Sequence, residues 1–254
     1  MSASFNLEEI MEGTAQDRAC RVTSIGSDEL PAAITLWRID LDLQADIPED
    51  MLGRLDAAEL NRAARYQQHA DRVRFTITRV VLKHALSRVA PGTDPREIHL
   101  DADCRDKPLW KGQPIEFNVT HSGKQAYVAV SRFGRVGVDV EEQRADFDYE
   151  EVCATVFTGK ELHALSEIPP SHRRRGFYDC WVRKEAVLKA TGLGITQCLQ
   201  DFSTVRGACD RWRIEVSECA DSSTAAMLRS LSISMLDAGP KYSAAIAFDM
   251  QPKA

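Results

Sequence analysis

Apolar and polar residues alternate with strand-like and helical periods along the chain. From Ile34, the stretch "ITLWRIDLDL" alternates apolar and polar residues as a half-buried strand does. Across residues 56–89 the apolar positions recur at spacings of three and four, which predicts two helices joined near His69. Order is expected to begin near Pro31, with residues 1–30 as a loosely organised N-terminal extension.

The middle and end of the chain repeat this change of period. Turn sequences "KGQP", "HSGK" and "RFGR" separate strand patterns that predict an antiparallel meander, at residues 97–102, 115–120, 125–131 and 135–140. Helical spacing follows over residues 148–191, with a break at "SEIPPS". Further strand patterns come after it, at residues 201–206, 211–217, 230–236 and "YSAAIAF". Such blocks of strands and helices predict an α+β fold.

The division of the chain is interpreted as two similar lobes after the extension, each a small antiparallel sheet packed with helices. The expected boundaries are 1–30 for the extension, 31–118 for the N-terminal lobe and 119–254 for the C-terminal lobe.

Composition and charge narrow the classes of function. The 254 residues hold 32 basic and 38 acidic side chains, and the net charge of −6 argues against a nucleic acid partner held by general electrostatics. The first residues, "MSASFNLEEIMEG", lack the basic and apolar segments of a signal peptide, and no stretch is long enough to span a membrane. A cytoplasmic protein without a membrane partner is expected. The seven cysteines form no C-x-x-C pair, which suits reduced thiols and argues against structural zinc.

Two carboxylates share one face of a predicted strand. In "VGVDVE" the valines alternate with Asp139 and Glu141, so both acids point the same way. Their Cα atoms are expected roughly 6.6 Å apart, close enough for both side chains to meet one small cation. A solvated strand face explains an isolated pair of this kind equally well.

A second pair of charges lies on a predicted helix. In "FYDCWVRKEAVLKATGLGI", Glu185 and Lys189 are four residues apart and project together from one face, and glycines at 192 and 194 end the helix. A metal together with a phosphate would use both groups. An ordinary helix pair of Glu and Lys, worth about 0.3–0.5 kcal/mol, is the alternative.

The two stretches together resemble the phosphopantetheinyl transferases, of the long two-lobed type that activates nonribosomal peptide, polyketide and related synthases. That family carries G-[IV]-D-[IV]-E and, some forty residues later, W-x-x-K-E-[AS]-x-x-K. Here they read "GVDVE" from Gly137 and "WVRKEAVLK" from Trp181. An upstream N-[IV]-S-H-S element stands as "NVTHS" from Asn118, and a G-K-P element as "DKP", with Asp106 in place of glycine.

The resemblance implies transfer of the 4′-phosphopantetheine arm of coenzyme A to a serine of an acyl or peptidyl carrier protein, with Mg²⁺ and release of adenosine 3′,5′-bisphosphate. It implies a pseudo-twofold fold of two similar lobes. Asp139, Glu141 and Glu185 would bind the metal, and Glu185 and Lys189 would be the catalytic pair. Glu185 is also a candidate base for the attacking serine, with the ligand role ranked above it.

Coenzyme A binding is implied for a further group of residues. Thr120, His121 and Lys189 would meet its phosphates, and Arg62, Arg105 and Lys107 are candidates for the 3′-phosphate and the seam between the lobes. The basic run Arg173, Arg174 and Arg175 offers a docking face for an acidic carrier protein, although such a run is more often merely solvated.

Two other functions use the same residues. A metal-dependent phosphohydrolase would employ the acids with water as nucleophile, but the two-metal sites usual in that class need more ligands than one D-x-E and one helix glutamate. A non-catalytic module that binds coenzyme A or a carrier protein would keep the fold without the chemistry. A monomer is expected, because a chain with both lobes can build the site without a partner.

Overall fold

The computed structural model of the chain describes residues 19–26, 30–102, 108–193, 199–207, 211–218 and 220–249. The chain divides into two compact units. Unit 1 comprises Met1–Ile115 and Lys124–Arg132, and unit 2 comprises Glu116–Gly123 and Phe133–Ala254. The boundary between residues 118 and 119 that the sequence favours stays a prediction.

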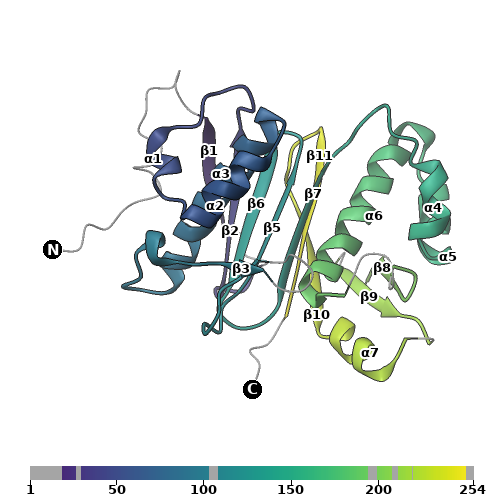
Figure 1. Ribbon diagram of the computed structural model, residues 1–254. Helices are drawn as coiled ribbons and strands as arrows, with labels where there is room; N and C mark the ends of the chain where they lie inside the picture. The colour runs from purple at the N-terminus through teal and green to yellow at the C-terminus, as the bar shows by residue number, and fades with distance from the viewer. Residues whose placement is uncertain are drawn as a thin grey trace. The chain divides into compact units, whose positions relative to one another are not determined.

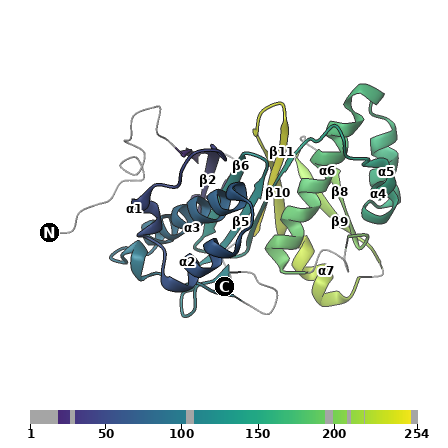
Figure 2. The same ribbon diagram turned by 45° about the horizontal axis from the view of Figure 1, so that its top comes forward.

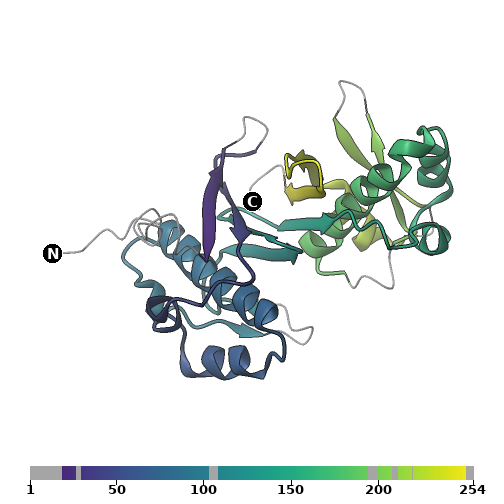
Figure 3. The ribbon, with the colours of Figure 1, turned by 90° about the horizontal axis from the view of Figure 1, so that it is seen from above.

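Unit 1 combines antiparallel strands with helices. Its strands are β1 (Cys20–Ile25), β2 (Ile34–Leu41), β3 (Asp101–Ala102), β4 (Pro108–Leu109) and β6 (Gln125–Ser131). Its helices are α1 (Glu49–Leu52), α2 (Ala57–Arg65), α3 (His69–Val89) and the 3₁₀ helix η2 (Pro95–Glu97). Strand β2 pairs with both β1 and β6, and α3 packs on β6 and β2 (Figure 3).

Unit 2 is built on a larger antiparallel sheet, in the strand order β7-β11-β10-β9-β8. Its strands are β5 (Glu116–Ser122), β7 (Val136–Glu142), β8 (Phe202–Arg206), β9 (Trp212–Val216), β10 (Leu231–Leu236) and β11 (Tyr242–Asp249). Its helices are α4 (Glu150–Val156), α5 (Gly159–Ser166), α6 (Pro170–Thr191) and α7 (Ser222–Arg229). The long helix α6 packs against β7 and β11 (Figure 1).

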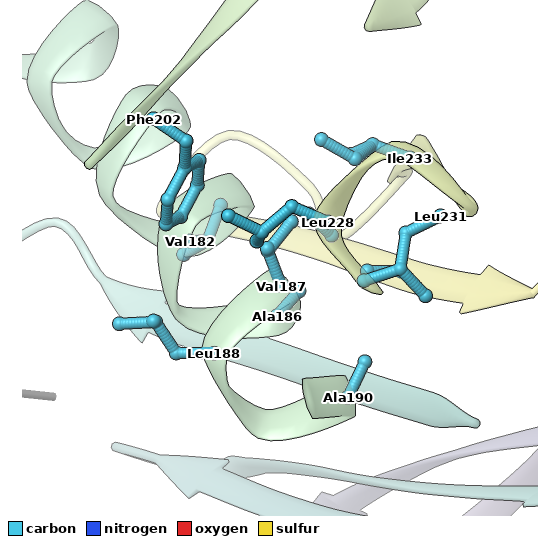
Figure 4. Close-up of a cluster of buried hydrophobic side chains, with 11 residues drawn as sticks. Val182, Ala186, Val187, Leu188, Ala190, Phe202, Leu228, Leu231 and Ile233 are labelled. Carbon is cyan, nitrogen blue, oxygen red and sulfur yellow. The ribbon is translucent and has the colours of Figure 1, made fainter. Parts of the chain in front are cut away.

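Local chemistry sets the ends of α6, and its apolar face sets its position. Pro170 occupies the first turn, where a missing N–H costs nothing, and Gly192 ends the helix in the left-handed conformation with φ 72°. Apolar side chains of α6, including Val182 and Val187, pack with Leu228 of α7 and Ile233 of β10 in a buried cluster (Figure 4). Burial of this cluster fixes α6 on the sheet.

Most predicted elements are confirmed, including two helices on either side of the link near His69 and the break at "SEIPPS". The expectation that order begins near Pro31 is wrong for Cys20–Ile25, which pair with β2. Three of the six side chains of this strand are exposed and two are half-buried, because it lies at the sheet edge, and its sequence therefore lacks a clear apolar face.

Three further differences separate the structure from what the sequence pattern predicts. The last step of the predicted meander is wrong, because β7 pairs with β11, which lies about a hundred residues later in the chain, and not with β6. Residues 97–100 are not a strand, since Pro95 and the side chain of Asp94, which accepts from the Arg96 N–H at 2.8 Å, begin a 3₁₀ turn. Helix α7 was not foreseen, although Asp221 caps it.

The contact of α6 with β7 requires a glycine at position 137. A Cβ atom there would overlap the Ala186 carbonyl oxygen and the Ala190 backbone nitrogen, neither of which can rotate away. At this position of unit 2, α6 and β7 thus approach each other backbone to backbone.

We expect Gly137→Ala to lower the free energy of unfolding by about 2 kcal/mol or more, because the added methyl group forces the helix off the strand. Gly159→Ala is the matched control, since nothing lies within 4 Å of a Cβ at that position and its backbone is helical. Urea unfolding of both variants measures the difference. Equal stability of the two variants would contradict this account of the contact.

Candidate active site

Residues Gly137, Asp139 and Glu141 share one face of β7, because side chains alternate along a strand. Gly137 faces α6 at Ala186 and Ala190, so the two acids face the same helix. The strand supplies the acids at fixed positions because it pairs along its whole length with β11.

Helix α6 brings a carboxylate and an ammonium group to these acids. The Lys189 Nζ lies 2.6 Å from Asp139 Oδ1 and 3.0 Å from the Thr120 hydroxyl oxygen. The Thr120 hydroxyl in turn donates to Asp139 Oδ1 at 3.1 Å. Glu185, one turn earlier on α6, is buried and close enough to Asp139 and Glu141 for their charges to act on it. Five of the predicted site residues therefore converge in unit 2.

Two further side chains of β5 form hydrogen bonds with β7. The sequence motif contains both residues but predicted no role for them. Asn118 Oδ1 accepts from the Val138 N–H at 3.0 Å. The Ser122 hydroxyl donates to Glu141 Oε2 at 2.8 Å and accepts from the Glu142 N–H at 3.0 Å. The signal that could have found them is the alternation in "NVTHS", which places positions 118, 120 and 122 on one face of the strand.

The surroundings of the three carboxyl groups of the site disfavour their ionised forms. Burial raises the pKa of Glu185 to about 7, and the charge of Asp139 adds to this shift. Burial, with Asp139 again adding, raises the pKa of Glu141 to about 6. Burial also raises the pKa of Asp139, against the opposing charge of Lys189. A single ammonium group thus does not compensate three buried acids, and further positive charge would stabilise their ionised forms.

The donor chemistry fits a hard divalent cation. Asp139 Oδ2 and Glu185 Oε1 are buried without a hydrogen-bond partner, which is costly for carboxylate oxygens. Mg²⁺ prefers carboxylate oxygens and keeps several further positions for phosphate and water. As the side chains lie, no three acidic, histidine or cysteine groups in the described residues form a closed metal cluster. The oxygens suit a cation held by few protein ligands and completed by other oxygens.

The other predicted site residues lie elsewhere or outside the described residues. His121 is exposed on β5, one position from Thr120, so the two side chains point to opposite faces of the strand. Arg62 belongs to α2 in unit 1, where its guanidinium lies over the Phe75 ring with 5.4 Å to the centroid. Arg105 and Lys107, with Asp106, lie outside the described residues.

The lysine before Glu185 has a structural role. Lys184 is completely buried, 2.8 Å from Glu161 and 2.7 Å from the Phe202 carbonyl oxygen, and so ties α6 to α5 and β8. Glu161 also completes a capping box with Thr158 at the start of α5. The T-x-x-E sequence of that box was the available signal for a helix start there.

The basic run at the start of α6 is largely engaged in local contacts. Arg173 donates to the Ile168 carbonyl at 2.9 Å, and Arg174 donates to the Phe147 carbonyl at 2.8 Å. Arg175 lies 3.7 Å from Asp179, four residues along the helix. These contacts anchor the loops before α6, and a docking role for the run stays a prediction.

Several known proteins are similar to this chain in sequence. Residues 135–247 match the family model of the 4′-phosphopantetheinyl transferase superfamily. The 4′-phosphopantetheinyl transferase HetI of Nostoc sp. (strain PCC 7120) is 33% identical over 168 residues, covering 65% of this chain and 70% of the relative. AcpT of Escherichia coli K12, also a 4′-phosphopantetheinyl transferase, is 30% identical over 167 residues, covering 65% of this chain and 80% of the relative.

Among solved structures, a holo-(acyl-carrier-protein) synthase from Bacillus anthracis in complex with CoA (3′,5′-ADP) covers 48% of this chain and 98% of its own, at 16% identity and a TM-score of 0.38. That structural likeness is low. The two sequence relatives, by contrast, are at least 30% identical and are covered over more than two thirds of their length. On the strength of those relatives, the chain belongs to the 4′-phosphopantetheinyl transferase superfamily.

Proposed function

We propose that this protein transfers the 4′-phosphopantetheine group of coenzyme A to a serine hydroxyl of an acyl or peptidyl carrier protein, with Mg²⁺, and releases adenosine 3′,5′-bisphosphate. The observation that carries the proposal is the convergence of Asp139, Glu141 and Glu185 beside Lys189 in unit 2. The names of the relatives, 4′-phosphopantetheinyl transferases, support it.

In this reaction the serine oxygen forms a bond to the phosphorus next to pantetheine, and the bond from that phosphorus to the bridging oxygen of the pyrophosphate breaks. The electron pair leaves with adenosine 3′,5′-bisphosphate, and the serine proton passes to a base. Asp139, Glu141 and Glu185 would hold Mg²⁺, which supplies Lewis-acid stabilisation of the charge on the phosphoryl oxygens. The ammonium of Lys189 would stabilise the same charge from the protein side.

Glu185 has two roles within the proposal. Its buried carboxylate has an oxygen without a partner, which suits a metal ligand. Its pKa of about 7 also suits a group that accepts a proton near neutral pH. We rank the ligand role first, because a bound cation lowers the basicity of the carboxylate that holds it.

Binding of coenzyme A is proposed to involve Thr120, His121 and Lys189 of unit 2, together with Arg62, Arg105 and Lys107. Hydroxyl, imidazole, ammonium and guanidinium groups all donate to phosphate oxygens. Lys189 is suited to this role because its side chain keeps 26% of its surface exposed while its ammonium contacts Asp139.

Subtype, state and location form the remaining part of the proposal. We propose that the chain is of the long two-lobed type, works as a monomer in the cytoplasm, and needs neither nucleic acid nor membrane. Three cysteines are free and buried, as expected in a reducing compartment: Cys20, Cys153 and Cys180. No helix in the described part of the chain is long and apolar enough to cross a membrane.

Intact-protein mass spectrometry tests the transfer directly. An apo carrier protein incubated with this chain, coenzyme A and Mg²⁺ should gain one phosphopantetheine mass. Glu185→Gln should slow the gain by on the order of a hundredfold, since it removes an anionic ligand of Mg²⁺ and a candidate proton acceptor. Glu167→Gln, on an exposed residue at the end of α5, is the matched control.

Coenzyme A cleavage without carrier modification would instead identify a phosphohydrolase. Coenzyme A binding with no change in either molecule, across several carrier proteins, would identify a binding module. Either result would overturn the proposed transfer.

The raised pKa of Glu185 predicts how stability depends on pH when metal is chelated. The folded protein holds a proton that the unfolded chain loses near pH 4.5, so stability falls as pH rises toward 7. Glu185→Gln removes this penalty and should be more stable than the wild type at pH 8 in EDTA, by on the order of 2–3 kcal/mol, with little difference at pH 5. Thermal unfolding at both pH values measures it, and a difference independent of pH would contradict it.

Ser122 is expected to position Glu141. Ser122→Ala removes the hydroxyl that holds Glu141 Oε2, so the apparent KM for Mg²⁺ should rise about tenfold, the loss of one hydrogen bond to a charged group. Ser122→Thr keeps the hydroxyl and should restore most of the affinity. Steady-state assays at varied Mg²⁺ measure this, and an unchanged KM for Mg²⁺ in Ser122→Ala would refute it.

A further inference from the structure

A cavity of about 340 Å³ lies within unit 2 and is lined by residues of α5, α6, β8 and β9. These four elements are labelled in Figure 2. Its walls are partly apolar, with Leu165, Ile168 and Val205 among the lining residues. The volume falls within the range of small-molecule pockets, roughly 300–1,000 Å³. No step of the proposed transfer uses this cavity.

A buried cation lines the cavity. Arg183 is only 5% exposed, its Nε donates to the Thr204 hydroxyl at 3.2 Å, and its guanidinium lies 3.4 Å from the centroid of the Trp212 ring. Its Nη1 also lies 3.9 Å from the sulfur of Met235. Within the described residues, no carboxylate forms an ion pair with Arg183. A buried charge without a counterion is costly, which calls for an explanation.

The acids that line the same cavity already have partners. Glu161 is 2.8 Å from Lys184 and accepts from the Thr204 N–H at 2.8 Å. Asp179 accepts from the Ser243 hydroxyl at 2.5 Å and pairs with Arg175. Neither acid forms an ion pair with Arg183, although the charges of both act on it from a distance. An anion entering the cavity would therefore meet a guanidinium that has no direct counterion.

We propose that this cavity binds a small aliphatic carboxylate, with its carboxylate on Arg183 and its alkyl chain against Leu165 and Ile168. An aliphatic body fits better than an aromatic one, because guanidinium groups of Arg183 and Arg206 already lie at the Trp212 ring, 3.4 and 5.0 Å from its centroid. A small molecule fits better than a folded partner, because Arg183 is buried below the surface.

The cavity is separate from the candidate active site. Arg183 and Glu185 are two residues apart on α6, which places their side chains about 200° apart around the helix axis. The inference goes beyond the proposed transfer, and its test measures binding alone, so the two can fail independently.

Octanoate titrated into the full chain tests the site, with the indole N–H signal of Trp212 followed by NMR. The wild type should show saturable shifts. Arg183→Met should bind at least about tenfold more weakly, as expected for loss of a charged hydrogen-bonding group. Arg229→Met, on an exposed residue at the end of α7, should bind as the wild type does.

Two measurements decide the matter if Arg183→Met fails to fold. With wild-type protein, 1-octanol should bind at least about tenfold more weakly than octanoate, because it lacks the charge. Ala164→Phe, at the exposed rim of the cavity, should block octanoate while leaving Arg183 intact. Equal binding of octanol and octanoate, full binding to folded Arg183→Met, or no saturable binding to the wild type at several millimolar octanoate would overturn the proposal.

Discussion

The approach of helix α6 to strand β7 is the contact on which the candidate site depends. Gly137 lets the helix backbone at Ala186 and Ala190 lie against the strand, because any side chain there would occupy the same space. The next residues along that face of the strand are Asp139 and Glu141, and those on the facing side of the helix are Glu185 and Lys189. One missing Cβ thus sets the distance between two pairs of charged groups.

Burial changes the pKa values of these neighbouring carboxyl groups. In water these acids would ionise independently, but in unit 2 burial and mutual repulsion raise the pKa of Glu141 to about 6 and that of Glu185 to about 7. Lys189 relieves only part of the repulsion through Asp139. Other contacts offset the unfavourable free energy of burying these acids, because the apolar packing of α6 and the buried Lys184–Glu161 pair hold the helix in place. Sites that must attract a cation and a phosphate are expected to store such strain.

Local patterns allowed much of the site to be predicted. Alternation in "VGVDVE" put Asp139 and Glu141 on one face, and a spacing of four joined Glu185 to Lys189. The pairing of strands that lie far apart in the sequence could not be predicted from local patterns. That β7 pairs with β11 depends on which distant strand covers its edge, and β1 lacks an apolar face because it is an edge strand. The burial of Lys184 and Arg183 was also hidden, since each depends on partners that only the fold supplies.

We propose that the three acids beside Lys189 hold a divalent cation. Anomalous scattering from a crystal grown with Mn²⁺ in place of Mg²⁺ and with coenzyme A tests it most directly, since Mn²⁺ accepts similar oxygen ligands. We predict one strong peak bounded by the carboxylates of Asp139, Glu141 and Glu185 and by a pyrophosphate oxygen. Density for coenzyme A with no anomalous peak at these carboxylates would contradict the account.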